Sequence, residues 1–333
     1  MSFYEDNQLS YVHVEATTRC NAACPMCLRN RSGDILNPEL KYDNFNIDWF
    51  DRFDLPINGL TLCGNYGDPI VHPNLHNLIE KWLEKFDKPI TMMTNGGART
   101  SDWWERLANV SKGKLTVIFG IDGLEDTNHL YRRNVDWQRL MVNSRAYIDA
   151  GGRAGWKFIT FKHNQHQVDK AREMSQSIGF AFFEQIITNR FRQEKFNVVD
   201  TNGNVLYHLE QPDIDESKFK AKNPNRISKD REWTGSISCY AKKENSVYIS
   251  ADGRVYPCCN LGYHFNHDLF EPYAAFASIY DMEEPKNINN MSLSDIVSGK
   301  FFREVKDKWS EIPLARCIRT CGVFRDNLSK KWE

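Results

Sequence analysis

The chain has 333 residues, 41% of them hydrophobic and 26% charged, which is the composition of a globular protein with room for one large domain and a smaller one. The net charge of −1 provides no basic field, so we expect no nucleic-acid partner. The polar N-terminus lacks the apolar segment of a secretory signal, and no apolar run is long enough to span a bilayer. We therefore expect a cytoplasmic protein with no membrane partner.

Short apolar runs alternate with amphipathic stretches through the first half of the chain. This alternation predicts βαβ units and a parallel sheet, either in a partial or full α/β barrel or in an open doubly wound sheet. The predicted strands are Tyr11–Ala16, Gly59–Cys63, Ile90–Thr94, Leu115–Ile121, Lys157–Phe161 and Ala181–Ile186. The predicted helices are Leu75–Phe86, Asp102–Val110, Trp137–Ala150 and Gln165–Ile178.

The chain changes character near residue 190. Residues 189–235 are polar and rich in Asn, Lys, Asp and Pro, which predicts an irregular connector that packs on the first domain or covers a site. Asp252-Gly253 lies between two short strand-like runs, a strong hairpin signal. The runs and the two predicted short helices after them are Ser246–Ser250, Val255–Cys258, Leu293–Ser298 and Phe301–Trp309. We therefore expect a core over 1–190, a connector over 191–235 and a C-terminal domain over 236–333.

The nine cysteines are unevenly distributed. Three lie near the start, Cys63 stands alone, and five fall in the last third of the chain. In a reducing compartment, clustered cysteines more often bind metal or do chemistry than form disulfides. The distribution predicts two separate metal sites in two domains.

Cys20, Cys24 and Cys27 form a Cys-x3-Cys-x2-Cys motif directly after the first predicted strand. A structural zinc site almost always has four ligands. A [4Fe–4S] cluster bound by three protein thiolates leaves one iron open for a substrate or cofactor. The spacing therefore favours a cluster, and the alternatives are a zinc loop with a fourth ligand from elsewhere or three buried structural cysteines.

With this motif the chain resembles the radical S-adenosylmethionine (SAM) superfamily. The resemblance covers roughly residues 10–190 and continues at the ends of the later predicted strands, with Asp68 in place of that family's usual Glu. The matching segments are Gly64-Asn65-Tyr66-Gly67-Asp68-Pro69, Thr94-Asn95-Gly96, Ile121-Asp122-Gly123 with Arg132 or Arg133 downstream, and Phe161-Lys162-His163-Asn164. In α/β barrels functional groups collect at the C-terminal ends of strands, which is where these segments fall.

The resemblance implies a partial (β/α)6 barrel whose first cluster binds SAM. It also implies contacts to SAM from Gly67, Asp68, Asn95, Asp122 and Asn164. For Asn95-Gly96 and Asp122-Gly123, ordinary turn chemistry is the alternative. The implied activity is reductive cleavage of SAM to a 5′-deoxyadenosyl radical that abstracts hydrogen from a substrate, with an electron donor such as flavodoxin or ferredoxin.

The cysteines in the last third resemble those of the auxiliary-cluster domain called SPASM, or its shorter form, the twitch domain. A full SPASM domain carries seven cysteines, and this region carries five. The resemblance implies one auxiliary [4Fe–4S] cluster bound by Cys239, Cys258, Cys317 and Cys321. Cys259 is the spare cysteine, although the choice between it and Cys258 stays open. The alternative is a four-thiolate zinc site.

The substrate does not follow from the sequence. The architecture implies an oxidation, a dehydrogenation or a peptide modification, acting on a small molecule or a peptide. Because the first predicted strand begins near Tyr11, we expect no leader-binding domain, which favours a small molecule or a protein presented without a leader. The rival function is a non-catalytic zinc or iron–sulfur protein that serves recognition.

Overall fold

A computed structural model describes residues 3–4, 9–36, 40–187, 191, 194–213, 231–266, 283–311 and 314–326. The chain divides into two compact units. The barrel unit comprises Val14–Ile47 and Asn58–Asp213. The C-terminal unit comprises Met1–His13, Asp48–Ile57 and Ile214–Glu333. The domain boundaries expected at residues 190 and 235 stay a prediction.

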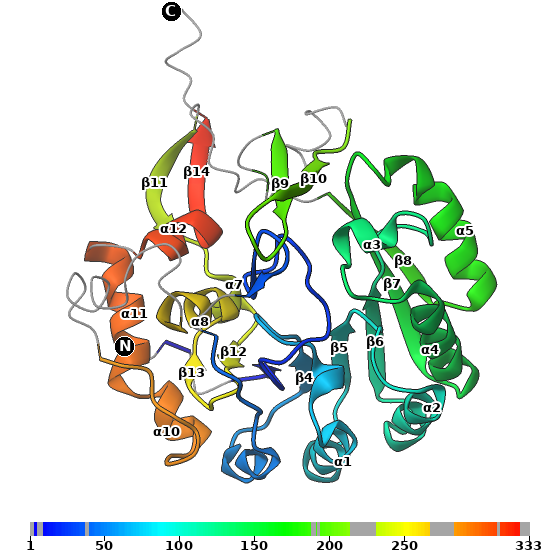
Figure 1. The fold of residues 1–333 in the computed structure, drawn as a ribbon. Helices are drawn as coiled ribbons and strands as arrows, with labels where there is room; N and C mark the ends of the chain where they lie inside the picture. The colour runs from blue at the N-terminus through cyan, green and yellow to red at the C-terminus, as the bar shows by residue number, and fades with distance from the viewer. Residues whose placement is uncertain are drawn as a thin grey trace, which may run out of the picture. The chain divides into compact units, whose positions relative to one another are not determined.

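Six strands form the sheet of the barrel unit, of which β4 to β8 are labelled in Figure 1. Of β1, only the last residue, Val14, belongs to this unit. The strands are β1 (Tyr11–Val14), β4 (Gly59–Leu62), β5 (Ile90–Thr94), β6 (Leu115–Gly120), β7 (Arg153–Thr160) and β8 (Phe182–Ile187). Their order in the sheet follows their order in the chain, and all pairs from β4 to β8 are parallel. A doubly wound sheet would reverse its strand order at a switch point. The structure therefore confirms the expected partial α/β barrel.

Amphipathic helices connect the parallel strands. They are α1 (Leu75–Phe86), α2 (Ser101–Val110), α4 (Trp137–Asp149) and α5 (Val168–Ile178), within two residues of the predicted bounds except where a 3-10 turn, η4 (Gln165–Gln167), precedes α5. Asp136 caps the start of α4 by accepting a hydrogen bond from Arg139 N–H. Gly179 ends α5 in the left-handed conformation, with φ +98°. Large buried rings, among them Trp104, Phe119 and Trp156, fill the core behind the sheet.

The region expected to be an irregular connector contains an antiparallel hairpin, so that expectation is wrong for residues 195–210. The hairpin comprises β9 (Lys195–Val199) and β10 (Val205–Glu210) and belongs to the barrel unit. Val198 and Leu209 are its buried residues. The Asp200 carboxylate accepts backbone N–H groups in the turn, and Gly203 supplies a positive φ there. The remaining short elements of this unit are β2 (Asn30–Arg31), β3 (Ile35–Leu36), η3 (Pro69–Val71) and α3 (Asn128–Tyr131).

The C-terminal unit contains the predicted hairpin, in which Tyr248 pairs with Tyr256 and Ile249 with Val255. Gly253 lies in its turn with φ +88°. Both predicted short helices are present, and the structure adds a two-stranded ribbon of β11 and β14. The elements are η2 (Ile47–Arg52), β11 (Arg231–Ile237), α7 (Tyr240–Lys243), β12 (Ser246–Ile249), β13 (Val255–Tyr256), α8 (Cys259–Asn266), α10 (Leu293–Val297), α11 (Lys300–Glu311), α12 (Ala315–Cys321) and β14 (Gly322–Asp326).

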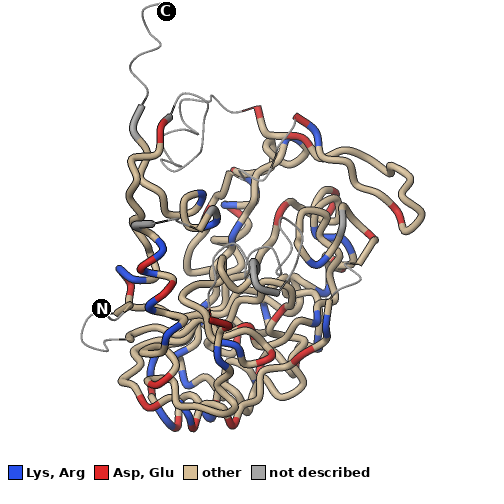
Figure 2. Tube along the Cα trace, turned by 90° about the vertical axis from the view of Figure 1, so that its left-hand side faces the viewer, with Lys and Arg blue, Asp and Glu red and all other residues tan. Residues whose placement is uncertain are grey.

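Acidic and basic residues are interleaved along the described trace, as Figure 2 shows, in keeping with the net charge of −1. Among the described helices, none combines the length and the apolar character needed to cross a membrane.

Candidate cluster sites

The loop that leaves β1 carries Cys20, Cys24 and Cys27. Cys27 N–H donates to the Cys24 carbonyl at 3.0 Å, which folds the second half of the motif into a turn. Burial raises the pKa of the Cys20 thiol, and the charges of Asp68, Cys24 and Cys27 raise it further. Thiolates at these positions would repel one another, a repulsion that positive metal charge would relieve.

Asn95, at the end of β5, connects Cys20 to the Gly-Asp-Pro segment after β4. Its Nδ2 lies 3.6 Å from Cys20 Sγ, 3.0 Å from Asn21 Oδ1 and 2.7 Å from Asp68 Oδ2. Asn95 N–H also donates to Asp68 Oδ2 at 2.7 Å, while Asp68 Oδ1 accepts Ile70 N–H at 3.2 Å. Burial raises the pKa of the Asp68 carboxyl, and these N–H donors act in the opposite direction. Asp68 thus orients Asn95, and Asn95 donates toward the Cys20 sulfur.

Gly67 lies against the backbone of the cluster loop. A Cβ built on it would stand 1.7 Å from the Thr17 carbonyl oxygen, so only glycine fits there. The buried Glu15 accepts hydrogen bonds from Tyr66 N–H at 2.7 Å and Gly67 N–H at 3.2 Å. No motif in the sequence marks Glu15; its one signal is a carboxylate at the end of an apolar strand run.

Asp122, after β6, pairs with Arg132. The ion pair spans 2.6 Å, with the Asp122 side chain fully buried and that of Arg132 19% exposed. Asp122 Oδ1 also accepts Ile159 N–H at 2.6 Å. Arg132 Nη1 lies 3.9 Å from Cys24 Sγ. Burial raises the pKa of the Cys24 thiol to about 11, and the charge of Arg132 opposes that rise. The pair therefore holds a cation beside the second cysteine of the motif.

Two buried amides flank Asp122. Asn164 donates to the carbonyls of Asp122 and Ile159 and accepts Phe161 N–H, so its side chain bonds three backbone groups. Asn128 accepts Asp122 N–H at 2.9 Å, but its own Nδ2 is buried without a hydrogen-bond partner in the described structure. Such an orphaned donor calls for an acceptor from outside the protein.

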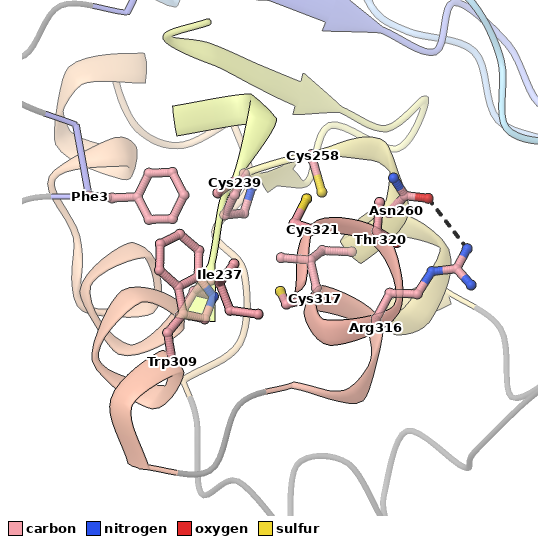
Figure 3. A pocket seen from close by; sticks show the side chains of 13 residues that line it. Phe3, Ile237, Cys239, Cys258, Asn260, Trp309, Arg316, Cys317, Thr320 and Cys321 are labelled. Atoms are coloured by element: carbon pink, nitrogen blue, oxygen red, sulfur yellow. Dashed lines mark hydrogen bonds between the residues drawn. The ribbon is translucent and has the colours of Figure 1, made fainter. Parts of the chain in front are cut away.

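The C-terminal unit brings four cysteines to one cavity. Cys239, Cys258, Cys317 and Cys321 line it together with apolar and aromatic side chains (Figure 3). Cys317 and Cys321, four residues apart on α12, present their sulfurs on one face of that helix. The Cys239 thiol beside it lowers the pKa of the Cys321 thiol.

Cys259 is absent from the cavity lining, and its sulfur lies 3.7 Å from Tyr240 Oη. Of the two adjacent cysteines, the geometry therefore places Cys258 with the other three.

In the described part of the chain, no three His, Cys, Asp or Glu side chains are close enough to share one metal ion. In a [4Fe–4S] cluster each thiolate binds a different iron, so the sulfurs stand further apart than around one zinc ion.

Comparisons with known proteins match both parts of the chain. The family model SPASM, described as an iron–sulfur cluster-binding domain, matches residues 239–322. A tungsten-containing aldehyde ferredoxin oxidoreductase cofactor-modifying protein from Pyrococcus furiosus is 28% identical over 116 residues. That match spans 35% of this chain and only 32% of the relative's length.

Solved structures share the fold at low sequence identity. Streptococcus suis SuiB bound to S-adenosylmethionine aligns with 93% of this chain and 67% of its own, at a TM-score of 0.53 and 14% identity. The protein anSMEcpe with bound AdoMet aligns with 94% of this chain and 85% of its own, at a TM-score of 0.55 and 13% identity. The chain thus shares its fold with these two S-adenosylmethionine-bound proteins, and residues 239–322 match the SPASM model of an iron–sulfur cluster-binding domain.

Proposed function

We propose that this chain is a radical SAM enzyme with two [4Fe–4S] clusters. In this proposal Cys20, Cys24 and Cys27 bind the cluster whose open iron holds SAM, and Cys239, Cys258, Cys317 and Cys321 bind the auxiliary cluster. The observation that carries it is the convergence of two side chains on one cysteine loop: Asn95, after β5, contacts Cys20, and Arg132, after α3, contacts Cys24. Structures of the same fold that contain S-adenosylmethionine support it.

The residues at the barrel site fit a cluster that carries SAM. The donor set is three thiols on one loop, which leaves one iron without a protein ligand. Gly67 lets the segment after β4 approach the loop closely, and the buried Nδ2 of Asn128 offers a free donor beside Asp122. We assign cofactor contact to the region of Gly67, Asn95 and Asp122.

With a cluster and SAM held at this site, the chemistry supplied would be one-electron reductive cleavage of SAM followed by hydrogen-atom abstraction from the substrate. The protein's own residues hold the geometry. Asn95 donates toward the Cys20 sulfur, and Arg132 provides fixed positive charge beside Cys24. Asp68 orients Asn95, and Asn164 fixes the backbone of Asp122, so we propose positioning roles for Asp68 and Asn164.

For the substrate class we propose a peptide or protein side chain. The support is that SuiB has been solved with the precursor peptide SuiA, and anSMEcpe with the Cp18Cys peptide. Both align with more than nine-tenths of this chain. A small flavodoxin- or ferredoxin-type protein is the proposed electron donor, and an oxidation assisted by the auxiliary cluster is the proposed outcome.

The test is SAM cleavage under anaerobic conditions. Reconstituted protein with dithionite and SAM should release 5′-deoxyadenosine, and the Cys20/Cys24/Cys27→Ala triple variant should release none. Cys63→Ala removes a cysteine outside both sets and should leave the release unchanged. A triple variant that still cleaves SAM would contradict the proposal. Wild-type protein that binds metal but leaves its EPR spectrum unchanged on SAM addition would favour a recognition protein instead.

A further inference from the structure

An aromatic wall closes one side of the cavity that holds the four C-terminal cysteines. Phe3 and Trp309 both line this cavity. Their rings meet edge to face, with centroids 5.7 Å apart and an interplanar angle of 64°. Phe302 packs on Phe3 in the same way, at 5.7 Å and 85°. Phe3 is fully buried, so the wall keeps water from this side of the cysteines.

Trp309 carries the one polar atom of this wall. Its Nε1 is buried and makes no hydrogen bond of normal geometry to a described protein atom. In Figure 3 the nitrogen lies on the edge of the indole ring that faces the cysteines. A buried indole N–H normally finds an acceptor, and Figure 3 shows Cys317 on the side of the cavity that this N–H faces.

Polar groups elsewhere around the cysteines are engaged with one another. Asn260 Nδ2 lies 3.5 Å from Tyr240 Oη, and Arg316 Nη2 lies 3.4 Å from Asn260 Oδ1. Tyr240 Oη in turn lies 3.7 Å from the sulfur of Cys259, which does not line the cavity. Tyr240 also interacts with Cys258, so this chain of contacts ends on the two adjacent cysteines and not on Cys317.

We propose that Trp309 is a redox-tuning residue of the auxiliary cluster, donating its indole N–H to the sulfur of Cys317 once the cluster is bound. This inference rests on the proposed function, which assigns a cluster to the cavity. A hydrogen bond to a ligand sulfur stabilises the more negative, reduced cluster and so raises its reduction potential. The apolar ring of Phe3 strengthens the effect by excluding water that would compete for the donor.

The experiment uses the Cys20/Cys24/Cys27→Ala variant, in which the auxiliary cluster is the only cluster expected. Its midpoint potential is measured by redox titration followed by EPR, with and without Trp309→Phe. The substitution should lower the midpoint potential by up to about 59 mV. For a one-electron couple, that shift is a tenfold change in the ratio of oxidised to reduced cluster. Trp233→Phe is the matched control, because Trp233 donates to Ser236 O outside the cavity lining.

The outcomes separate this inference from the proposed function. An unchanged potential in Trp309→Phe, or an equal shift in Trp233→Phe, overturns the role of Trp309. Absence of any auxiliary-cluster signal before Trp309 is changed overturns the cluster assignment itself. If Trp309→Phe fails to retain the cluster, tryptophan labelled with ¹⁵N in the indole tests the contact without a substitution. A ¹⁵N coupling to the reduced cluster supports the hydrogen bond, and its absence overturns it.

Discussion

At the scale of single residues, Asp68 joins two loops of the barrel unit through its two carboxylate oxygens. Oδ2 accepts both the backbone N–H and the side-chain amide of Asn95, and Oδ1 accepts Ile70 N–H. The buried Asp68 carboxylate already accepts these three hydrogen bonds. Its role is therefore to hold Asn95 near Cys20. Residues that the sequence marks as cofactor contacts therefore act partly through one another.

Asp68→Ala should lower the free energy of unfolding by about 1–3 kcal/mol, because it leaves buried N–H groups without an acceptor. It should also lower the iron retained at the barrel site, since Asn95 loses its anchor. Urea denaturation and iron analysis measure the two effects. Asp149→Ala, at an exposed position at the end of α4, is the control and should change stability by less than about 0.5 kcal/mol. Equal effects in the two variants would argue against the positioning role.

Arg132 and Asp122 form a buried ion pair, so substituting either residue alone should destabilise the fold. Arg132→Met should destabilise the fold by about 3–5 kcal/mol, because it strands a fully buried carboxylate. The Asp122→Asn/Arg132→Met double variant should recover part of that loss, giving a coupling energy in a double-mutant cycle. Urea denaturation of the four proteins measures it, with the exposed Arg139→Met as control. Strictly additive losses would show that the two side chains act independently.

At the scale of elements, the sequence predicts the barrel well and the connector poorly. Ile90–Thr94 alternates buried and half-buried positions on a strand, and the helices have long apolar faces. In the β9–β10 hairpin only Val198 and Leu209 are buried, and the surrounding Asn and Lys residues conceal the alternation. The signal that could have predicted this hairpin is local: Asp200 and Gly203 lie in a tight turn between two short apolar runs.

The site follows a similar division. Strand-end motifs predict where Asp68, Asn95 and Asp122 lie, because parallel strands end at one edge of a sheet. Which side chain meets which cysteine depends on tertiary packing, so the sequence left Arg132 and Arg133 equivalent. In the structure Arg132 forms an ion pair with Asp122, and Arg133 forms one with Asp34. Trp309 carries no motif at all, since a tryptophan on an amphipathic helix is usually a core residue.

The β9–β10 hairpin holds the loop that follows the cysteine motif. Val199 N–H donates to the Ser32 carbonyl at 2.8 Å, and Asp34 N–H donates to the Val199 carbonyl at 3.2 Å. Arg133 binds both carboxylate oxygens of Asp34 and also donates to Tyr207 Oη. The hairpin is therefore a clamp on the cluster loop rather than a free connector.

Tyr207→Phe should loosen this clamp, because Tyr207 Oη also donates to the Leu130 carbonyl at 2.8 Å. We expect faster hydrogen exchange at the amides of Asp34 and Val199, measured by mass spectrometry on peptides that cover 30–36 and 195–210. Val205→Ala changes an exposed residue of the same hairpin and should leave exchange unaltered. Unchanged protection in Tyr207→Phe would mean that the backbone pairing alone holds the hairpin.

At the scale of the whole molecule, the two proposed clusters have separate ligand sets. The three cysteines of the first lie in the barrel unit, and the four of the second lie in the C-terminal unit. No described residue serves as a proposed ligand in both sets. Loss of one set should therefore leave the other cluster in place, because a metal site depends on its own ligands and their local support.

This independence gives a prediction in iron counts. Anaerobically reconstituted protein should contain about eight iron atoms, since each [4Fe–4S] cluster holds about four. The Cys20/Cys24/Cys27→Ala variant and the Cys239/Cys258/Cys317/Cys321→Ala variant should each retain about half. Cys259→Ala is the matched control, because Cys259 contacts Tyr240 rather than the cavity, and it should keep the full count. Loss of half the iron in Cys259→Ala would make that cysteine a ligand.

Two other results would contradict the prediction. Zinc in place of the second iron pool would contradict the auxiliary cluster. About twelve iron atoms would require a third cluster, for which the five C-terminal cysteines provide too few thiolates.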